Sequence, residues 1–137
     1  MTVVEELERH IRRHGYLCLD GGLATALESK GHVLDDSLWS ARILRDAPEE
    51  IVAVHREFLA SGARCISSAS YQAHEWGFVR AGISAQEGCR LIDVSIELAI
   101  QAREGFLRDS GCKDSVFVAA SLGPFGAYLA EIGRAHV

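Results

Sequence analysis

The sequence predicts an α/β fold with a parallel sheet, because strand-like and helix-like segments alternate along the chain. Three short apolar segments, at residues 16–19, 64–68 and 115–121, have the length and composition of buried strands. Segments with helical spacing of apolar residues separate them. Strands that alternate with helices pair in parallel and are covered by those helices. We therefore expect one α/β domain, a size that the 137 residues allow.

The segment before the first strand and two segments after it have helical patterns. Residues 3–14 predict a short amphipathic helix. Residues 23–30 suit one or two helical turns that end at Gly31, since glycine readily takes the left-handed conformation of a helix end. Residues 37–45 predict another short helix.

Two longer helices flank the second strand. The first is expected to start near Asp46, with Pro48 in its first turn, and to end at Gly62. Its apolar residues fall on one face at helical spacing: Ile51, Val54, Phe58 and Leu59. The second helix is expected to start at Ser84, which forms a capping-box pattern with Glu87, and to reach residue 107.

Composition and charge exclude several classes of partner. The chain has 19 acidic and 14 basic residues, a net charge of −5, and contains no basic block. A nucleic-acid partner would need a basic patch, so none is expected. Apolar runs are far shorter than the ~20 residues that span a bilayer, which argues against a membrane partner. The charged N-terminus lacks the apolar core of a signal peptide, so we expect a cytoplasmic protein.

The spacing of cysteine and histidine residues predicts no metal site in this chain. The four cysteines form no C-x-x-C pair: Cys18, Cys65, Cys89 and Cys112. We expect reduced thiols, with Cys18 and Cys65 buried in strands. His10 and His14 share one helix face, but no third ligand is near them in the sequence. We therefore expect them to lie on a solvated face.

Each predicted strand ends in small or polar residues, at 20–22, 67–71 and 121–126. Ligand sites of parallel α/β folds lie at the carboxyl ends of the strands. Gly21 and Gly22 allow backbone N–H groups to approach an anion, while Asp20 suits an ammonium group. This combination fits a zwitterion such as an amino acid. The alternative is a plain turn in which an exposed aspartate caps the next helix.

The second strand end carries several hydrogen-bonding side chains: Ser67, Ser68, Ser70, Tyr71 and Gln72. Hydroxyl groups can bind a carboxylate, and an aromatic ring can face a cationic methyl donor. The alternative is a polar loop that Trp76 and Phe78 attach to the core.

Five stretches resemble, in order and with fitting gaps, the N-terminal part of the homocysteine S-methyltransferase family. They read LDGGLATALESKG, LWSARIL, PEEIVAVHREFLASGA, SSASYQA and VAASLGPFGAYLA. The resemblance runs from Leu17 to Ala130. It implies a fold made of about three βα units from the N-terminal part of a (β/α)8 barrel. Residues 1–130 would then be a partial homocysteine-binding domain.

The resemblance also implies a reaction. Family members transfer a methyl group to the zinc-activated thiolate of homocysteine, giving methionine. The SYQA form is similar to the branch that uses S-methylmethionine or S-adenosylmethionine. By this resemblance, Asp20 would bind the homocysteine ammonium, and the amides of Gly21 and Gly22 with the Ser67 hydroxyl would bind its carboxylate. Tyr71 would line the donor side.

The resemblance covers only part of such an enzyme. A (β/α)8 barrel takes roughly 250 residues. The three zinc-binding cysteines of the family belong to later motifs, so none of the four cysteines here is assigned to the zinc. We expect a truncated, inactive part of the enzyme. The last residues, 131–137, read EIGRAHV, like a translated sequencing adapter, and we expect a non-native tail.

Two alternatives remain open at this stage. Another (β/α)-barrel enzyme could use the DGG turn to bind a different amino acid or a phosphate. The chain could also be a non-catalytic fragment. The sequence does not specify an oligomeric state.

Overall fold

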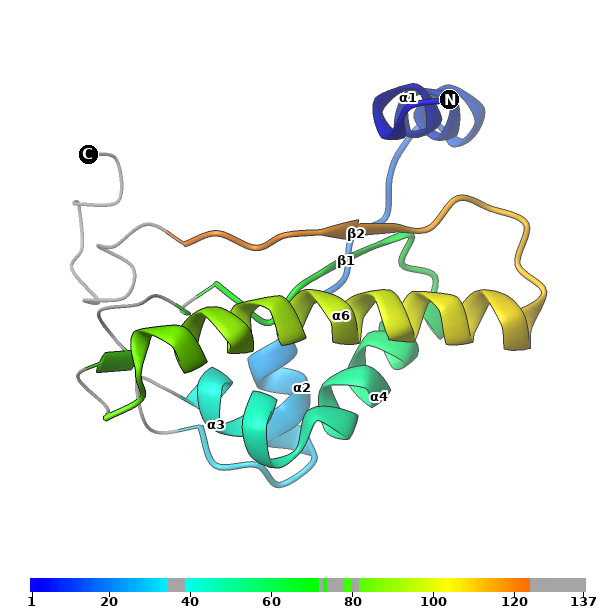
Figure 1. Cartoon of the computed structure of the whole chain (residues 1–137). Helices are drawn as coiled ribbons and strands as arrows, with labels where there is room; N and C mark the ends of the chain where they lie inside the picture. The colour runs from blue at the N-terminus through cyan, green and yellow to red at the C-terminus, as the bar shows by residue number, and fades with distance from the viewer. Residues whose placement is uncertain (35–38, 72, 74–77, 80–81, 124–137) are drawn as a thin grey trace, which may run out of the picture.

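The computed structural model describes residues 1–34, 39–71, 73, 78–79 and 82–123 (Figure 1). The expected tail at 131–137 therefore lies outside the described residues, as do Gln72 and Trp76. None of the described helices has the length and hydropathy needed to span a bilayer.

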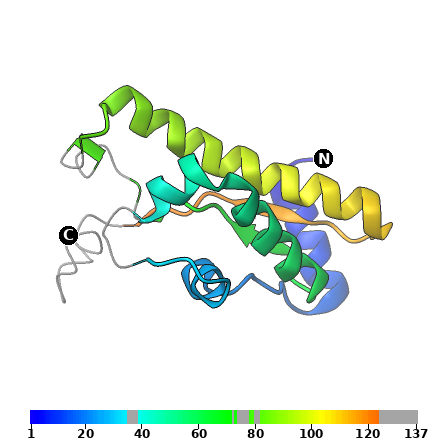
Figure 2. The same ribbon diagram turned by 90° about the horizontal axis from the view of Figure 1, so that it is seen from below.

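Helices and strands alternate as expected, and the α/β class is confirmed. The elements are α1 (Val3–His14), α2 (Leu23–Ser29), α3 (Trp39–Asp46), α4 (Pro48–Ala60), β1 (Cys65–Ser67), α6 (Ala85–Ser110) and β2 (Phe117–Ala119). β1 and β2 pair in parallel, with Cys65 opposite Phe117 and Ser67 opposite Ala119. The long helix α6 runs beside the strands and packs against α4 (Figures 1 and 2).

The segment expected as a buried first strand is only partly confirmed. Leu19 forms a parallel bridge with Cys65, and Asp20 N–H donates to the Cys65 carbonyl at 2.9 Å. Within the described part of the chain no element pairs with the outer edge of this segment. Cys18 is therefore exposed and Leu19 is 62% exposed, so the expected burial of Cys18 is wrong, whereas Cys65 is buried.

Side chains near the helix ends explain the positions of α1 and α6. Thr2 and Glu5 form a complete capping box at the start of α1, and Gly15 ends the helix with φ +82°. The Ser84 hydroxyl accepts from Glu87 N–H at 3.2 Å, as the sequence predicts for the start of α6. The helix continues to Ser110, slightly beyond the expected end.

The start of α4 differs from the expectation in one respect. Pro48 is in the first turn, but the N-cap is Ala47, which makes no side-chain hydrogen bond. Asp46 instead ends α3, where its carboxylate pairs with Arg45 at 2.8 Å. A proline preorganises the first helical turn without a capping side chain, so α4 can begin there.

Two apolar clusters form the core between the helices and the sheet. The first is built around Leu27, Ile51, Val54, Phe78 and Leu91, and the second around Leu59, Ile66, Ala99, Ala102 and Val116. The apolar face of α4 predicted from the sequence thus supplies residues to both clusters. α6 carries a glycine, Gly88, at its contact with the Phe78 ring, where a Cβ would overlap that ring.

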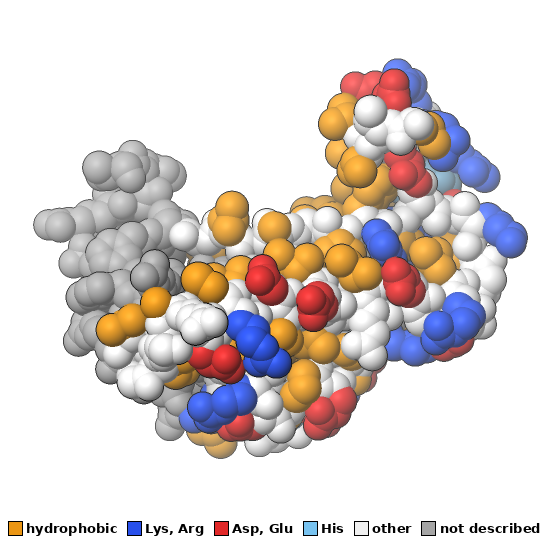
Figure 3. Space-filling view, in the orientation of Figure 1, with side chains coloured by type: hydrophobic (Ala, Val, Ile, Leu, Met, Phe, Trp, Pro, Cys, Tyr) orange, Lys and Arg blue, Asp and Glu red, His pale blue; other side chains and the backbone are white. Residues whose placement is uncertain are grey.

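Several large apolar side chains remain on the surface, beside α1 and along the sheet (Figure 3). On α1 they are Val3, Val4 and Ile11, and near the sheet they are Tyr16, Leu19 and Leu122. The open edge beside Leu19 also presents backbone groups that another strand could pair with. Exposed strand edges with adjoining apolar surface promote association.

We predict that the isolated 137-residue polypeptide aggregates or fails to unfold cooperatively. Exposed apolar side chains and an open sheet edge would favour intermolecular contacts over the monomer. Size-exclusion chromatography with light scattering, followed by thermal unfolding, tests this. A soluble monomer with one cooperative transition would contradict the prediction.

Candidate functional site

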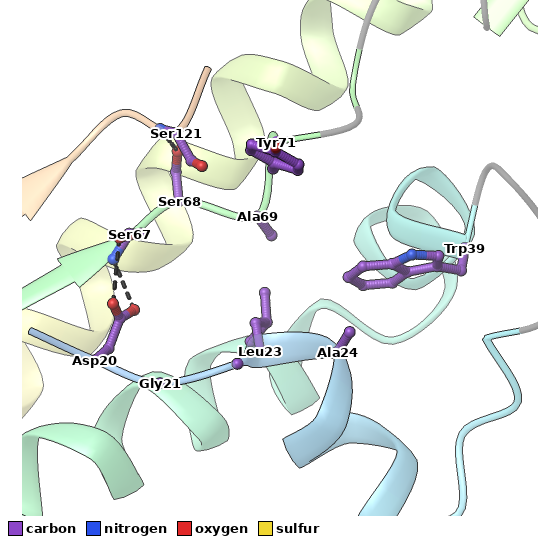
Figure 4. A pocket seen from close by; sticks show the side chains of 11 residues that line it. Asp20, Gly21, Leu23, Ala24, Trp39, Ser67, Ser68, Ala69, Tyr71 and Ser121 are labelled. Atoms are coloured by element: carbon purple, nitrogen blue, oxygen red, sulfur yellow. Dashed lines mark hydrogen bonds between the residues drawn. The ribbon is translucent and has the colours of Figure 1, made fainter. Parts of the chain in front are cut away.

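A cavity of about 400 Å³ opens where the ends of the sheet meet the first turn of α2 and the start of α3 (Figure 4). Five of its lining residues are the site residues predicted from sequence: Asp20, Gly21, Gly22, Ser67 and Tyr71. The others are Leu23, Ala24, Trp39, Ser68, Ala69 and Ser121. The parallel pairing explains why segments so far apart in sequence meet, since it places all their carboxyl ends at one edge.

Asp20 is held against the end of β1 by both of its carboxylate oxygens. Oδ2 accepts from the Ser67 backbone N–H at 2.8 Å, and Oδ1 accepts from the Ser67 hydroxyl at 3.2 Å (Figure 4). A carboxylate can accept about four hydrogen bonds. The two from Ser67 therefore fix the orientation of Asp20 and leave acceptor capacity for a cationic group in the cavity.

Gly21 is required by close packing. A Cβ on Gly21 would lie 2.9 Å from Cε1 of Phe58 on α4, so a side chain at this position would force the Phe58 ring or the segment to move. Neither Gly21 nor Gly22 has positive φ, so left-handed backbone is not the reason for glycine at these positions. Gly22 caps α2 without a side-chain hydrogen bond.

The backbone N–H groups of the glycine pair are available at the cavity. Neither Gly21 nor Gly22 donates a backbone hydrogen bond to another residue in the described ranges. Unpaired N–H groups just before a helix can bind an anion such as a carboxylate. These groups and the Asp20 carboxylate line the same cavity, so opposite charges of one small molecule can be accommodated there.

Ser68 and Ser70 use their hydroxyl groups within the protein. Ser121 N–H donates to the Ser68 hydroxyl at 3.0 Å, the two serine oxygens lie 2.7 Å apart, and the Ser70 hydroxyl donates to the Ser121 carbonyl at 2.9 Å. This closed ring joins the carboxyl ends of β1 and β2. Both hydroxyl groups are thus engaged within the protein, as in the alternative of a polar loop, and neither serine was assigned to a substrate.

Trp39 is a site residue that sequence reasoning missed. Its indole faces the cavity from the start of α3, across from Tyr71 in the turn that follows β1 (Figure 4). The position of Tyr71 depends on Gly123, where a Cβ would overlap the Tyr71 carbonyl oxygen. Tryptophan and tyrosine faces attract cations. The cavity therefore combines an aromatic side with a side that carries the carboxylate.

His55 lies on α4 and is fully buried. Neither ring nitrogen has a hydrogen-bond partner among the described residues. Burial lowers the pKa of His55, an effect that the nearby Asp20 carboxylate partly offsets. A neutral imidazole is thus part of the electrostatic surroundings of Asp20, and it was not singled out by any sequence motif.

The described residues do not form a metal centre. No group of three or more His, Cys, Asp or Glu side chains among them could hold a metal ion. Cys18 precedes α2 and Cys89 lies on α6, and both are exposed. Burial, aided by the Asp20 carboxylate, raises the pKa of the Cys65 thiol, and a protonated thiol is a poor metal ligand.

Comparisons with known proteins give a consistent result. The family model described as homocysteine S-methyltransferase matches residues 17–136. A homocysteine S-methyltransferase of Escherichia coli (strain K12) is 46% identical over 131 residues, which are 96% of this chain and 42% of that protein. A selenocysteine Se-methyltransferase of Brassica oleracea var. italica is 43% identical, over 85% of this chain and 36% of that protein.

A solved structure agrees with the sequence comparisons. The metallated form of the homocysteine methyltransferase MmuM from Escherichia coli matches with a TM-score of 0.89 and 41% identity. The match covers 96% of this chain and 47% of that one. The chain therefore spans less than half the length of these relatives.

We predict that His55 makes the fold sensitive to mild acid. Its pKa is lower in the folded state than the ordinary value of 6.5, so below that pH the unfolded state binds more protons and stability falls. The test uses a chimera of residues 1–130 with the remaining C-terminal segment of the Escherichia coli relative. Thermal unfolding of this chimera should show a smaller loss of stability between pH 7 and pH 5 in His55→Leu.

The control is His32→Gln, because His32 is partly exposed and lies 3.8 Å from the Glu50 carboxylate, whereas His55 is buried without a partner. Equal acid sensitivity of the unsubstituted chimera and His55→Leu would contradict the prediction.

Proposed function

The chain belongs to the homocysteine S-methyltransferase family, and we propose that it provides the amino-acid-binding part of an enzyme that methylates homocysteine to methionine. The observation that supports this most directly is the cavity in which Asp20, the glycine amides and two aromatic rings meet. The relatives of this chain by sequence are methyltransferases of homocysteine and selenocysteine. Both are amino acids with a nucleophilic side chain.

Asp20 is proposed to bind the ammonium group of homocysteine. Its carboxylate is already oriented by Ser67 N–H at 2.8 Å, so little ordering remains to be done when the substrate binds. The N–H groups of Gly21 and Gly22 would bind the substrate carboxylate. The Ser67 hydroxyl can rotate toward that carboxylate once the ammonium satisfies Asp20, because a hydroxyl donor turns freely about its C–O bond.

Tyr71 and Trp39 are proposed to line the side of the methyl donor. S-methylmethionine and S-adenosylmethionine each carry a sulfonium cation, which aromatic faces attract by about 0.5–2 kcal/mol. The two rings face the cavity from different elements (Figure 4), so a donor could be held between them. The other side of the cavity would then hold the acceptor.

The remaining parts of the enzyme are proposed from the family. The residues described here do not fit a zinc site, so a zinc-activated homocysteine thiolate would need ligands outside them. The parallel pairing of β1 and β2 suits the first part of a (β/α)8 barrel. The rest of the barrel would correspond to the additional length of the relatives. A cytoplasmic location is part of this proposal.

We predict that Asp20→Asn in the chimera raises the KM for homocysteine by roughly 10- to 100-fold. A hydrogen bond to a charged group contributes about 1.5–3 kcal/mol, which corresponds to that factor. The KM for the sulfonium donor should change little. Steady-state kinetics with each substrate varied in turn gives both values.

Asp93→Asn is the matched control, since Asp93 is exposed on α6. An unchanged homocysteine KM in Asp20→Asn would contradict the assignment of Asp20. A chimera that binds phosphate in this cavity but no amino acid would favour the alternative interpretation, in which the DGG turn belongs to a phosphate-binding barrel enzyme.

We also predict that the 137-residue chain alone forms no methionine from homocysteine and S-methylmethionine, even with added zinc. The described residues lack the three ligands that would hold and activate the thiol. Chromatographic detection of methionine is the measurement. Zinc-dependent formation of methionine by the chain alone would be incompatible with this account.

A further inference from the structure

A second cavity, of about 290 Å³, lies between the last turns of α1 and the loop that leads into β2. It is lined by Arg9, His10, Arg13, His14, Lys113, Asp114 and Ser115. Residues 113–115 precede β2, whereas the candidate functional site follows it. The second cavity is therefore at the opposite end of the sheet, and nothing in the proposed reaction uses it.

This cavity is basic in a protein that is acidic overall. Within the described ranges, Arg9, Arg13 and Lys113 form no ion pair with a carboxylate. Arg12 on the same helix, in contrast, pairs with Glu8 at 3.5 Å. Uncompensated positive charge that converges on one cavity favours an anion there. Figure 3 shows basic side chains gathered around α1.

Asp114 supplies the one carboxylate among the lining residues, and its charge is already balanced. It lies 3.5 Å from the Arg64 guanidinium and 3.5 Å from Nε2 of His14. Ser115, which also lines the cavity, donates its hydroxyl to Glu6 Oε1 at 2.7 Å. The positive charge of Arg9, Arg13 and Lys113 is therefore not neutralised by these neighbours.

His10 is a second, independent indication of a ligand. It is only 6% exposed, yet no residue in the described part of the chain forms a hydrogen bond with its ring. Its ring stacks near His14, with centroids 4.5 Å apart, and meets the edge of Phe117. The ring nitrogens of His10 are not among the fully buried unpaired atoms, and the residue lines the cavity. A ligand in the cavity could therefore accept a hydrogen bond from the ring N–H. The expectation that His10 lies on a solvated face is therefore wrong.

We propose that this cavity binds a phosphate group, either free phosphate or the phosphate of a small monoester. Two guanidinium groups and an ammonium suit a dianionic oxyanion with several acceptor oxygens. The volume fits one such group with a few waters. The electrostatic effect of the α1 C-terminus explains the basic residues on α1 itself. It does not explain why Lys113, in the loop before β2, lines the same cavity.

The lowered pKa of His10 agrees with positive charge around the cavity, although burial is its first cause. Burial is the largest cause that lowers the pKa of His10, followed by the neighbouring His14. Arg64 and Arg13 lower it further, and Asp114 alone raises it. Arg9 and Lys113 face the same cavity. A bound phosphate would oppose these effects and raise the pKa of His10, which provides a signature that depends on binding at this place.

The test is a titration of the chimera with inorganic phosphate at low ionic strength, by calorimetry and by NMR of the histidine rings. We expect millimolar or tighter binding and an increase in the pKa of His10. Arg13→Gln and Lys113→Gln should each weaken binding roughly fivefold or more, because each removes one of the three charges. Arg12→Gln is the matched control on the same helix and should change affinity less than twofold.

Glycerol phosphate, titrated in parallel, distinguishes the two sources of phosphate. Tighter binding of the ester identifies a monoester ligand, and equal binding identifies the phosphate group alone. Two results would overturn the proposal: no binding up to about 10 mM phosphate, as expected if a carboxylate of the added segment fills the cavity, or equal weakening by Arg12→Gln and Arg13→Gln. Circular dichroism of each variant confirms that the fold is intact, whatever the chimera's methyltransferase activity.

Discussion

The pair of hydrogen bonds from Ser67 to Asp20 is the interaction on which the arrangement of the candidate site depends. It joins the segment before α2 to the carboxyl end of β1, with distances of 2.8 and 3.2 Å. Gly21 follows directly and lies against the Phe58 ring, where a Cβ would be 2.9 Å from Cε1. The same bonds orient the Asp20 carboxylate. The fold and the site therefore share this contact, which adds to the backbone bond from Asp20 N–H to the Cys65 carbonyl, and a substitution at Ser67 would disturb the site.

Much of the fold could be predicted because its signals are local. Capping residues such as Thr2 and Ser84 act within one turn, so the starts of α1 and α6 follow from a few letters of sequence. The apolar face of α4 is likewise a matter of spacing. Burial in the first strand could not be predicted this way. It depends on whether a neighbour covers the outer edge of Leu19, and spacing within the segment contains no information on that.

The candidate site was predictable where a strand end determines it and unpredictable where packing does. Asp20 and Tyr71 follow strand-like segments, and parallel pairing brings such positions together. Trp39 starts a helix, and nothing local indicates which side its indole faces. Ser68 and Ser70 looked available because their mutual ring with Ser121 forms only after β1 and β2 pair. His10 looked solvated because the loop before β2, which covers it, is about a hundred residues away.

The exposed thiol of Cys18 allows chemical labelling to report on the open edge of the sheet. Its backbone carbonyl is paired inward with Arg64 N–H at 2.8 Å, while the side chain remains accessible. A maleimide or a disulfide reagent would modify this position readily as long as nothing lies against it. If another strand docks there, the same cysteine becomes shielded. A labelling rate of Cys18 well below that of exposed Cys89 on α6 would then show that another strand covers the sheet edge.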